Sequence, residues 1–147
     1  LSAESGNLVT EIRAVKMMGE NTFYLVDAGF NNLARPIMYG SYHPISVVTA
    51  DAVAREEVNV VVGGPLCESG DIFTQEEGGF VSKRSLPQAN VGEFLVLECA
   101  GAYGSVMGSN YNSKPLAAEV MIVDGQAHLI RARQSYDDLM RGEKLVD

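Results

Sequence analysis

Short apolar runs separated by turn residues recur along the chain, and few of them are long enough for a helix. Residues 7–15, NLVTEIRAV, alternate between two sets of side chains, and residues 21–29, NTFYLVDAG, form an apolar run that ends at Asp27 and Gly29. Such patterns are typical of strands. The intervening MGENT predicts a hairpin turn between them.

The same pattern continues to the end of the chain. Strands are expected at VNVVVGG (58–64), GEFLVLECAG (92–101), and AEVMIV with QAHLIR on either side of Asp124-Gly125, a dipeptide that favours a two-residue hairpin. One clear helix is expected at 135–141, where Ser135 can cap the first turn and Gly142 can end the last. The predicted fold is therefore mainly β, an antiparallel barrel or sandwich with a few short helices.

Length and composition narrow the class of protein. The 147 residues, 46% of them hydrophobic, suit a single domain spanning 1–147. A net charge of -8 argues against nucleic acid or an anionic membrane as partner and favours a small metabolite. Neither a membrane-spanning apolar run nor a secretory signal is visible, which predicts a soluble, cytoplasmic protein.

The cysteines and histidines predict no disulfide framework and no metal site. Cys67 and Cys99 are far apart and form no CxxC motif, so reduced thiols are expected. His43 and His128 are not spaced as metal ligands, and His128 is expected on a strand surface.

The beginning of the chain is unusual, because LSAESGNLVTEIRAV enters a strand almost at once without an initiating methionine. We therefore expect the chain to be a piece of a longer protein.

One stretch, GGPLCESGDIF (63–73), places a thiol and two carboxylates at the end of a predicted strand. Backbone N–H groups at a helix start would favour a thiolate, whereas Glu68 and Asp71 would keep the Cys67 thiol protonated and able to donate a proton. On this pattern alone, the favoured interpretation is a buried cysteine beside solvated carboxylates.

Four segments together resemble the C-terminal β-domain of the diaminopimelate decarboxylases, nearly end to end. They are FYLVDAGFNNLARPIMYGSYHPI (23–45), GGPLCESGDIFTQEEGG (63–79), GAYGSVMGSNYNSKPLAAEV (101–120) and LIRARQSYDDL (129–139). The resemblance implies a fold-type III enzyme dependent on pyridoxal 5'-phosphate, a homodimer that converts meso-diaminopimelate to L-lysine and carbon dioxide. Relatives acting on ornithine, arginine or carboxynorspermidine keep a similar cysteine turn, and the long YGSYHPI favours diaminopimelate.

The resemblance also implies roles for individual residues. Arg35 and Tyr39 match positions that hold the substrate's distal carboxylate, and Glu68 matches a contact to its distal ammonium. Cys67 matches the proton donor that acts after decarboxylation, reaching with Glu68 into the partner subunit's active site. Tyr103 matches a residue that contacts both cofactor and substrate.

Simpler interpretations stand beside these roles. Arg35 can be a surface arginine, and Tyr39 and Tyr103 can be tyrosines half-buried at a barrel rim. Asp71 is expected to cap a helix after Cys67. Three further expectations concern other residues: Cys99 packs in the core, Lys114 near GSNYN lacks the partners of a serine-lysine hydrolase, and none of Lys16, Lys83, Lys114 and Lys144 matches the cofactor lysine.

The family's cofactor lysine, stacking histidine and phosphate loop belong to an N-terminal (β/α)8 barrel that this sequence lacks. An arginine of the family's substrate site should lie just before Leu1. We therefore expect this chain to carry half of an active site and to be inactive by itself. The alternative hypothesis is a non-catalytic β-domain with a binding or interaction role.

Overall fold

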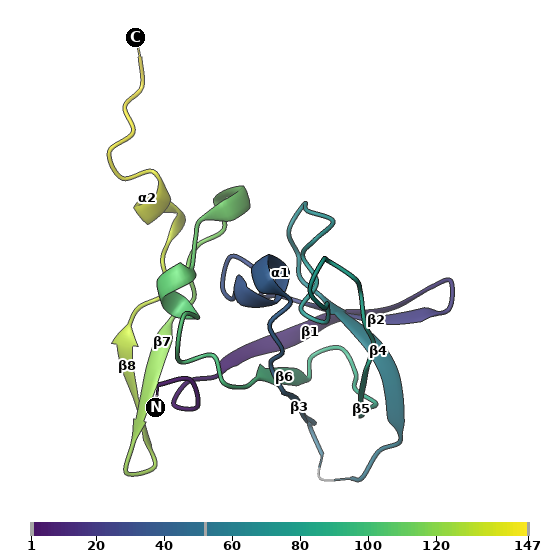
Figure 1. The fold of residues 1–147 in the computed structure, drawn as a ribbon. Coiled ribbons are helices and arrows are strands. Elements are labelled where there is room, and N and C mark those ends of the chain that lie inside the picture. The colour runs from purple at the N-terminus through teal and green to yellow at the C-terminus, as the bar shows by residue number, and fades with distance from the viewer. Residues whose placement is uncertain (1, 52, 147) are drawn as a thin grey trace. The chain divides into compact units, whose positions relative to one another are not determined.

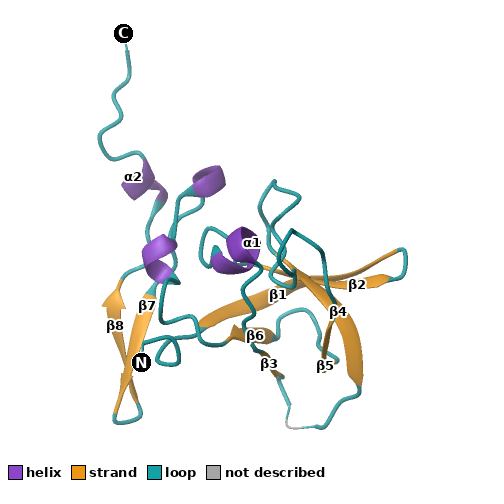
Figure 2. Cartoon of the chain, viewed as in Figure 1, coloured by secondary structure: helices purple, strands orange, loops and turns teal. Residues whose placement is uncertain are grey.

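The computed structural model describes residues 2–51 and 53–146. They divide into two compact units, Leu1–Gly108 and Ser109–Asp147 (Figure 1), which are described here separately. Strands and loops dominate the chain and the helices are short (Figure 2), which confirms the mainly β prediction. No helix among the described residues combines the length and the apolar character needed to cross a bilayer.

The described residues of the first unit form six strands, one α-helix and one 3-10 helix. The strands are β1 (Leu8–Met18), β2 (Asn21–Val26), β3 (Ile45–Val48), β4 (Glu57–Gly63), β5 (Arg84–Pro87) and β6 (Phe94–Leu97), and the helices are α1 (Arg35–Tyr39) and η1 (Ser105–Met107).

The six strands form one sheet in the order β3-β6-β1-β2-β4-β5. Neighbouring strands are antiparallel except β2 and β4, which are parallel. The edge strands β3 and β5 also contact each other, so the sheet nearly closes into a barrel. The loops that leave β2 and β4 carry most of the predicted site residues.

The interior of this sheet is the hydrophobic core of the first unit. Every second residue of a strand points to the same face, so one side of each strand can be buried. Val60, Val61 and Val62 of β4 are all fully buried, because this strand is covered on both faces. The core cluster contains Val60 and Val62 together with the following side chains from other strands and loops: Ile12, Tyr24, Val26, Ala28, Leu33, Phe73, Leu86, Ala89, Leu95 and Leu97.

The predicted first hairpin is confirmed. Met18 of β1 pairs with Asn21 of β2, and Gly19 takes a φ of 60° in the turn. That φ lies in the left-handed region, where a glycine has no side chain to clash. The register of the pair is irregular between Ile12 and Ala14.

A largely buried ion pair between Arg55 and Glu93 was not predicted. Arg55 donates to both carboxylate oxygens of Glu93, over 2.7 and 2.8 Å, and also to Asp51. The backbone N–H groups of Ala50 and Asn90 donate to the same Glu93 carboxylate. These bonds, led by the one from Arg55, lower the pKa of Glu93 to about 2.

The second unit contains η2 (Tyr111–Ser113), β7 (Glu119–Val123), β8 (Gln126–Arg131) and α2 (Tyr136–Leu139). The strands form the predicted hairpin, with Asp124 and Gly125 at φ values of 50° and 76°. Two consecutive positive φ values are typical of a type I′ turn. His128 lies on exposed β8, as predicted.

The predicted C-terminal helix is confirmed, although it is only one turn long. Ser135 accepts a hydrogen bond from the Asp138 N–H, and Asp138 accepts one from the Ser135 N–H, which makes a capping box. These hydrogen bonds lower the pKa of Asp138. Gly142 follows with a φ of 95°, so the chain turns where the sequence predicts.

Candidate functional site

The loop after β2 is fixed to β1 by hydrogen bonds and leads to α1. Asp27 accepts hydrogen bonds from the buried Thr10 hydroxyl over 2.6 Å and from the Glu11 N–H over 2.9 Å. The Ala28 N–H donates in turn to the Thr10 oxygen. The start of the loop is thereby held against the sheet, which gives the following helix a rigid support.

The helix α1 ends in a tight turn at Gly40. The Gly40 N–H donates to the Pro36 carbonyl, the bond of an αL C-cap, and the Ser41 N–H donates to the Arg35 carbonyl. Gly40 has a φ of 60°, and a Cβ there would lie 2.1 Å from the backbone nitrogen of Glu77. Only glycine fits this position, and the turn sends the chain back past Arg35.

The Arg35 guanidinium contacts the rings of two predicted site residues. Its Cζ lies 5.6 Å from the centroid of the Tyr39 ring and 5.5 Å from that of the Tyr103 ring. Cation–π contacts at exposed sites are worth about 0.5–1 kcal/mol each. Among the described residues, no carboxylate forms an ion pair with Arg35. The charge is therefore held in place and available to an anion.

Tyr103 is presented to solvent by a turn with an unusual backbone. Its φ is 56° and its side chain is 62% exposed. A left-handed φ costs a non-glycine residue free energy, and such residues cluster at functional sites. The turn is crowded, since a Cβ on Gly104 would lie 2.1 Å from the Ala100 carbonyl oxygen. The fold thus keeps the Tyr103 ring exposed at the cost of an unfavourable backbone conformation.

A cavity of about 350 Å³ lies beside this cluster. Arg35 and Tyr103 line it together with residues from the chain start, the turn after α1 and the segment after β6: Ala3, Ser41, Tyr42, His43, Cys99 and Ala102. Its size is within the range of small-molecule sites. Cys99 is half-buried at this cavity, outside the core cluster, so the prediction that it packs in the core is wrong.

Cys67 lies on an exposed turn after β4, and Asp71 organises this turn. Asp71 is buried, and its carboxylate accepts hydrogen bonds of 2.8 Å from the Leu66 N–H and from the Phe30 N–H. The expectation that Asp71 caps a helix after Cys67 is wrong, because the described residues 64–83 contain no helix. Asp71 instead fastens the Cys67 turn to the loop that leads into α1.

Cys67 and Glu68 are both exposed, and neither lines the cavity beside Arg35. Glu68 accepts a hydrogen bond from the Gly70 N–H over 3.1 Å, which folds the turn back on itself. A Cβ on Gly70 would lie 3.8 Å from the Ile37 side chain of α1. The structure therefore brings together Arg35, Tyr39 and Tyr103, and it places Cys67 and Glu68 on a neighbouring turn.

Two polar groups near this cluster were not predicted as site residues. Tyr42 stacks under the Arg84 guanidinium, with 3.8 Å between Cζ and the ring centroid. His43 is buried, and its Nδ1 lies 2.9 Å from the Glu98 carbonyl oxygen. The sequence places both residues in YGSYHPI, but only their proximity to Arg35 in space indicates a part in the site.

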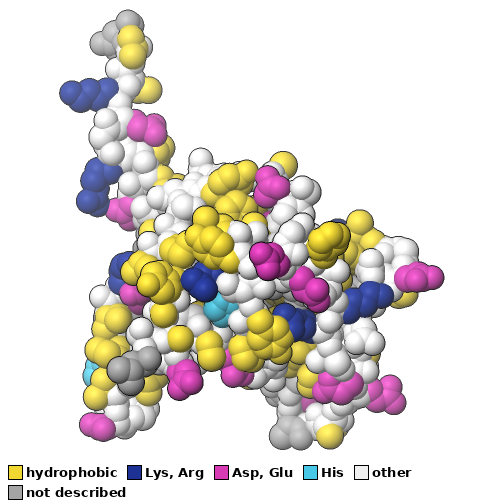
Figure 3. All heavy atoms as spheres, viewed as in Figure 1, with side chains coloured by type: hydrophobic (Ala, Val, Ile, Leu, Met, Phe, Trp, Pro, Cys, Tyr) yellow, Lys and Arg dark blue, Asp and Glu magenta, His cyan; other side chains and the backbone are white. Residues whose placement is uncertain are grey.

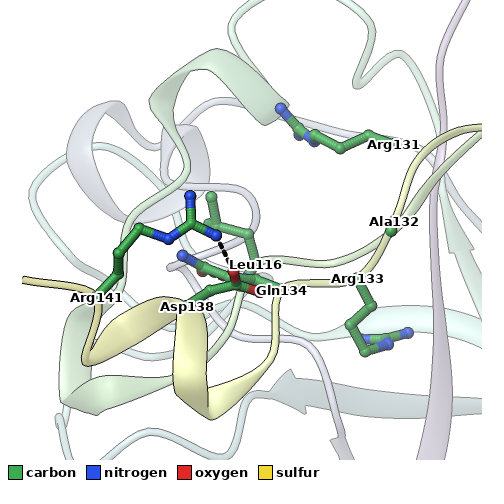
Figure 4. Close-up of a pocket in the computed structure, with 7 residues that line it drawn as sticks. All are labelled: Leu116, Arg131, Ala132, Arg133, Gln134, Asp138 and Arg141. Carbon is green, nitrogen blue, oxygen red and sulfur yellow. Dashed lines mark hydrogen bonds and ion pairs between the residues drawn. The ribbon is translucent and has the colours of Figure 1, made fainter.

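A second pocket, of about 310 Å³, lies in the second unit and contains three arginines, Arg131, Arg133 and Arg141. Figure 4 shows that their side chains extend in different directions, with Arg141 reaching Asp138. Arg131 also pairs with Glu119. None of the predicted site residues lines this pocket.

The first unit fits a contact with pyridoxal phosphate, but it does not offer a complete cofactor site. Tyr103 presents a ring and a hydroxyl at the cavity, and Arg35 supplies a cation beside it. No lysine lines the cavity, and Lys83 donates to the Glu20 carbonyl elsewhere. The residues that line this cavity therefore supply no lysine to which a cofactor could be attached.

Comparison with known proteins identifies the class. Residues 3–101 match the family described as the C-terminal sheet domain of pyridoxal-dependent decarboxylases, so the chain belongs to this family. The matched range includes Arg35, Tyr39, Cys67 and Glu68, whereas Tyr103 lies just beyond it.

Individual relatives narrow the resemblance. The diaminopimelate decarboxylase of Escherichia coli strain K12 is 56% identical over 99% of this chain, which spans about a third, 35%, of that relative. A crystal structure of diaminopimelate decarboxylase superposes with a TM-score of 0.92 at 56% identity, covering 95% of this chain and 34% of the other. The Helicobacter pylori diaminopimelate decarboxylase, solved in complex with L-lysine, gives a TM-score of 0.80 at 36% identity, over 95% of this chain and 32% of its own.

Proposed function

We propose that this chain is the C-terminal domain of a diaminopimelate decarboxylase, which converts meso-2,6-diaminopimelate to L-lysine and carbon dioxide. The observation that carries the proposal is the Arg35 guanidinium, which contacts the rings of Tyr39 and Tyr103 and has no carboxylate partner among the described residues. A substrate with a second carboxylate supplies the missing anion.

Arg35 and Tyr39 bind the substrate carboxylate that is retained in the product. A guanidinium offers parallel N–H donors in a fixed fork that matches the oxygens of a carboxylate, and a phenol adds one hydrogen bond. Such a clamp selects a substrate with two carboxylates over ornithine or arginine, which have one. Glu68 binds the distal ammonium, because its carboxylate is exposed and opposite in charge.

Pyridoxal phosphate, when bound, supplies the electron sink that the loss of carbon dioxide requires. Tyr103 contacts the cofactor and the substrate through its exposed ring and hydroxyl. Cys67 then donates its proton to the carbon that has lost carbon dioxide: the S–H bond breaks, a C–H bond forms, and solvent reprotonates the thiolate. This acid role requires a reduced thiol, which favours the cytoplasm.

The active site is shared between the subunits of a homodimer, with Cys67 and Glu68 reaching toward the partner's Arg35 cluster. The exposed position of Cys67, away from the cavity beside Arg35, supports this arrangement. We expect the isolated chain to self-associate at high concentration, measured by light scattering. A clean monomer would count against a dimer built by this domain alone.

The proposal is tested in a chimera in which this chain replaces the matching C-terminal third of the Escherichia coli enzyme. We call this chimera the restored enzyme. It should release carbon dioxide from meso-diaminopimelate and not from ornithine or arginine, whereas the isolated chain should release none. A restored enzyme that binds pyridoxal phosphate but leaves meso-diaminopimelate unchanged would refute the proposal and favour a non-catalytic binding role.

A further inference from the structure

Stacking leaves one degree of freedom of Arg35 undefined. The rings of Tyr39 and Tyr103 hold the guanidinium by contacts at 5.6 and 5.5 Å. A contact with the face of a ring does not fix rotation of the guanidinium within its own plane. A bidentate grip on a carboxylate needs that rotation fixed, because the donor fork has a defined direction. An acceptor at the edge of the guanidinium would fix it.

His43 has the properties of such an acceptor. Its ring is 7% exposed, and its Nδ1 lies 2.9 Å from the Glu98 carbonyl oxygen, which can only accept. The proton of a neutral ring is thus on Nδ1, and Nε2 carries a lone pair. Nε2 is buried and has no hydrogen-bond partner among the described residues. A buried polar atom without a partner is costly and rare, so its retention indicates a ligand or a transient partner.

Arg35 and His43 line the same cavity, and the backbone holds them close in sequence and in space. The Gly40 turn brings the Ser41 N–H within 3.3 Å of the Arg35 carbonyl oxygen, so the chain doubles back before His43. The other polar side chains there are poorer candidates. Tyr42 is exposed and stacks under Arg84, and Ser41 carries a freely rotating hydroxyl.

We infer that His43 is a positioning residue of the carboxylate clamp. Its Nε2 accepts a hydrogen bond from an Arg35 N–H, directly or through one water, when the substrate carboxylate occupies the site. The Glu98 carbonyl fixes the tautomer, and His43 fixes the direction in which the remaining Arg35 donors point. This inference rests on the proposed function, since it assigns His43 to the same carboxylate site.

Two substitutions separate this role from a purely structural one. In His43→Asn the side-chain amide can occupy the position of Nδ1, keeping the bond to the Glu98 carbonyl while removing the acceptor at Nε2. In His43→Gln the amide reaches the position of Nε2 and the bond to Glu98 is lost. A structural role predicts that Gln is the more damaging change, whereas a positioning role predicts that Asn is.

The readout is the dissociation constant of L-lysine in the restored enzyme, measured by calorimetry, with 1,5-diaminopentane as the control ligand that has no carboxylate. His43→Asn should weaken L-lysine binding roughly three- to tenfold, the effect of one hydrogen bond. It should leave the binding of 1,5-diaminopentane unchanged, and His43→Gln should recover most of the L-lysine affinity. Equal losses in both variants, no loss in His43→Asn, or an equal loss for 1,5-diaminopentane would each overturn the inference.

A double-mutant cycle decides the matter if His43→Gln fails to fold. In an Arg35→Lys background, His43→Asn should have little further effect on L-lysine binding, because His43 acts through the guanidinium. Additive losses would overturn the inference. A wild-type restored enzyme that binds no L-lysine would instead refute the proposed function, and the clamp with it.

Discussion

The two units of the chain differ in how they bury apolar side chains. In the first unit, Leu95 and Leu97 of β6 are completely buried with the other core residues. In the second unit, Ile122 of β7 is 64% exposed and Leu129 of β8 is 65% exposed. Figure 3 shows hydrophobic side chains reaching the surface on the face in view.

This difference indicates which unit has a packed core that can hold functional side chains in place. A strand pair that leaves its apolar side chains in solvent gains little free energy from burial, since that gain scales with the apolar area removed from water. The nearly closed sheet of the first unit holds its connecting segments on a packed core, and these segments carry Arg35 and Tyr39 on helix α1 and Cys67 and Tyr103 on turns. The second unit carries a well-formed hairpin without a comparable core among its described residues.

The largest expected effect is on the free energy of unfolding of the isolated chain, when a leucine is replaced by alanine in each unit. Leu95→Ala removes a fully buried side chain and should lower the free energy of unfolding by about 2–5 kcal/mol. Leu129→Ala removes an exposed one and should change it by less than about 0.5 kcal/mol. Urea unfolding of the two variants measures both values. Equal losses would show that the hairpin is as well packed as the barrel.

The next largest expected effect is on kcat/KM of the restored enzyme, when an arginine from each of the two pockets is replaced by lysine. Arg35→Lys should weaken transition-state binding by about 1.5–3 kcal/mol, the range for a charged hydrogen bond, because an ammonium cannot reproduce the donor fork. Arg133→Lys, in the second unit, should leave kcat/KM for meso-diaminopimelate within about twofold. Steady-state kinetics measures both, and cofactor absorbance should be unchanged. If Arg35→Lys left kcat/KM unchanged, Arg35 would not be a substrate-binding residue.

A smaller effect concerns acid stability. The folded chain lowers the pKa of Glu93 from its ordinary 4.5 to about 2, so this group contributes stability above pH 4.5 that is lost as the pH falls toward 2. Glu93→Gln should therefore be less stable than wild type at neutral pH and should flatten the acid-side decline in urea midpoint. Asp138→Asn, in the half-exposed capping box, is the control and should change the profile less. Parallel profiles for wild type and Glu93→Gln would contradict this role.

The sequence predicts the long strands and hairpins because they follow local rules. Alternation and turn dipeptides suffice for β1, β2, β7 and β8. The short strands β3 and β5 escape these rules. The strand β6 is equally short, but it lies in a longer apolar run between Gly92 and Gly101, a signal that β3 and β5 lack. The helix α1 was not predicted either, because its five residues are too few to show a helical period.

The candidate site also has features that the sequence predicts and features that only the structure shows. The resemblance brought Arg35, Tyr39 and Tyr103 together although 68 positions separate the first from the last. It gave no indication that Arg55 and Glu93, 38 positions apart, form an ion pair. It also gave no role to His43, whose significance depends on a carbonyl 55 positions away and on an unpartnered nitrogen. Contacts between segments that are distant in the sequence can be identified only in the folded chain.

The most direct test of the account mixes two variants of the restored enzyme, Arg35→Ala and Cys67→Ala, which each lack one residue that sustained L-lysine formation requires. If Cys67 serves the active site of the partner subunit, a mixed dimer contains one site with both residues intact and one with neither. Unfolding and refolding the two together should recover about a quarter of the wild-type rate of L-lysine formation, as random pairing predicts. No recovery, with dimers shown to have exchanged, would contradict a shared site in which this domain supplies the clamp to one subunit and the acid to the other.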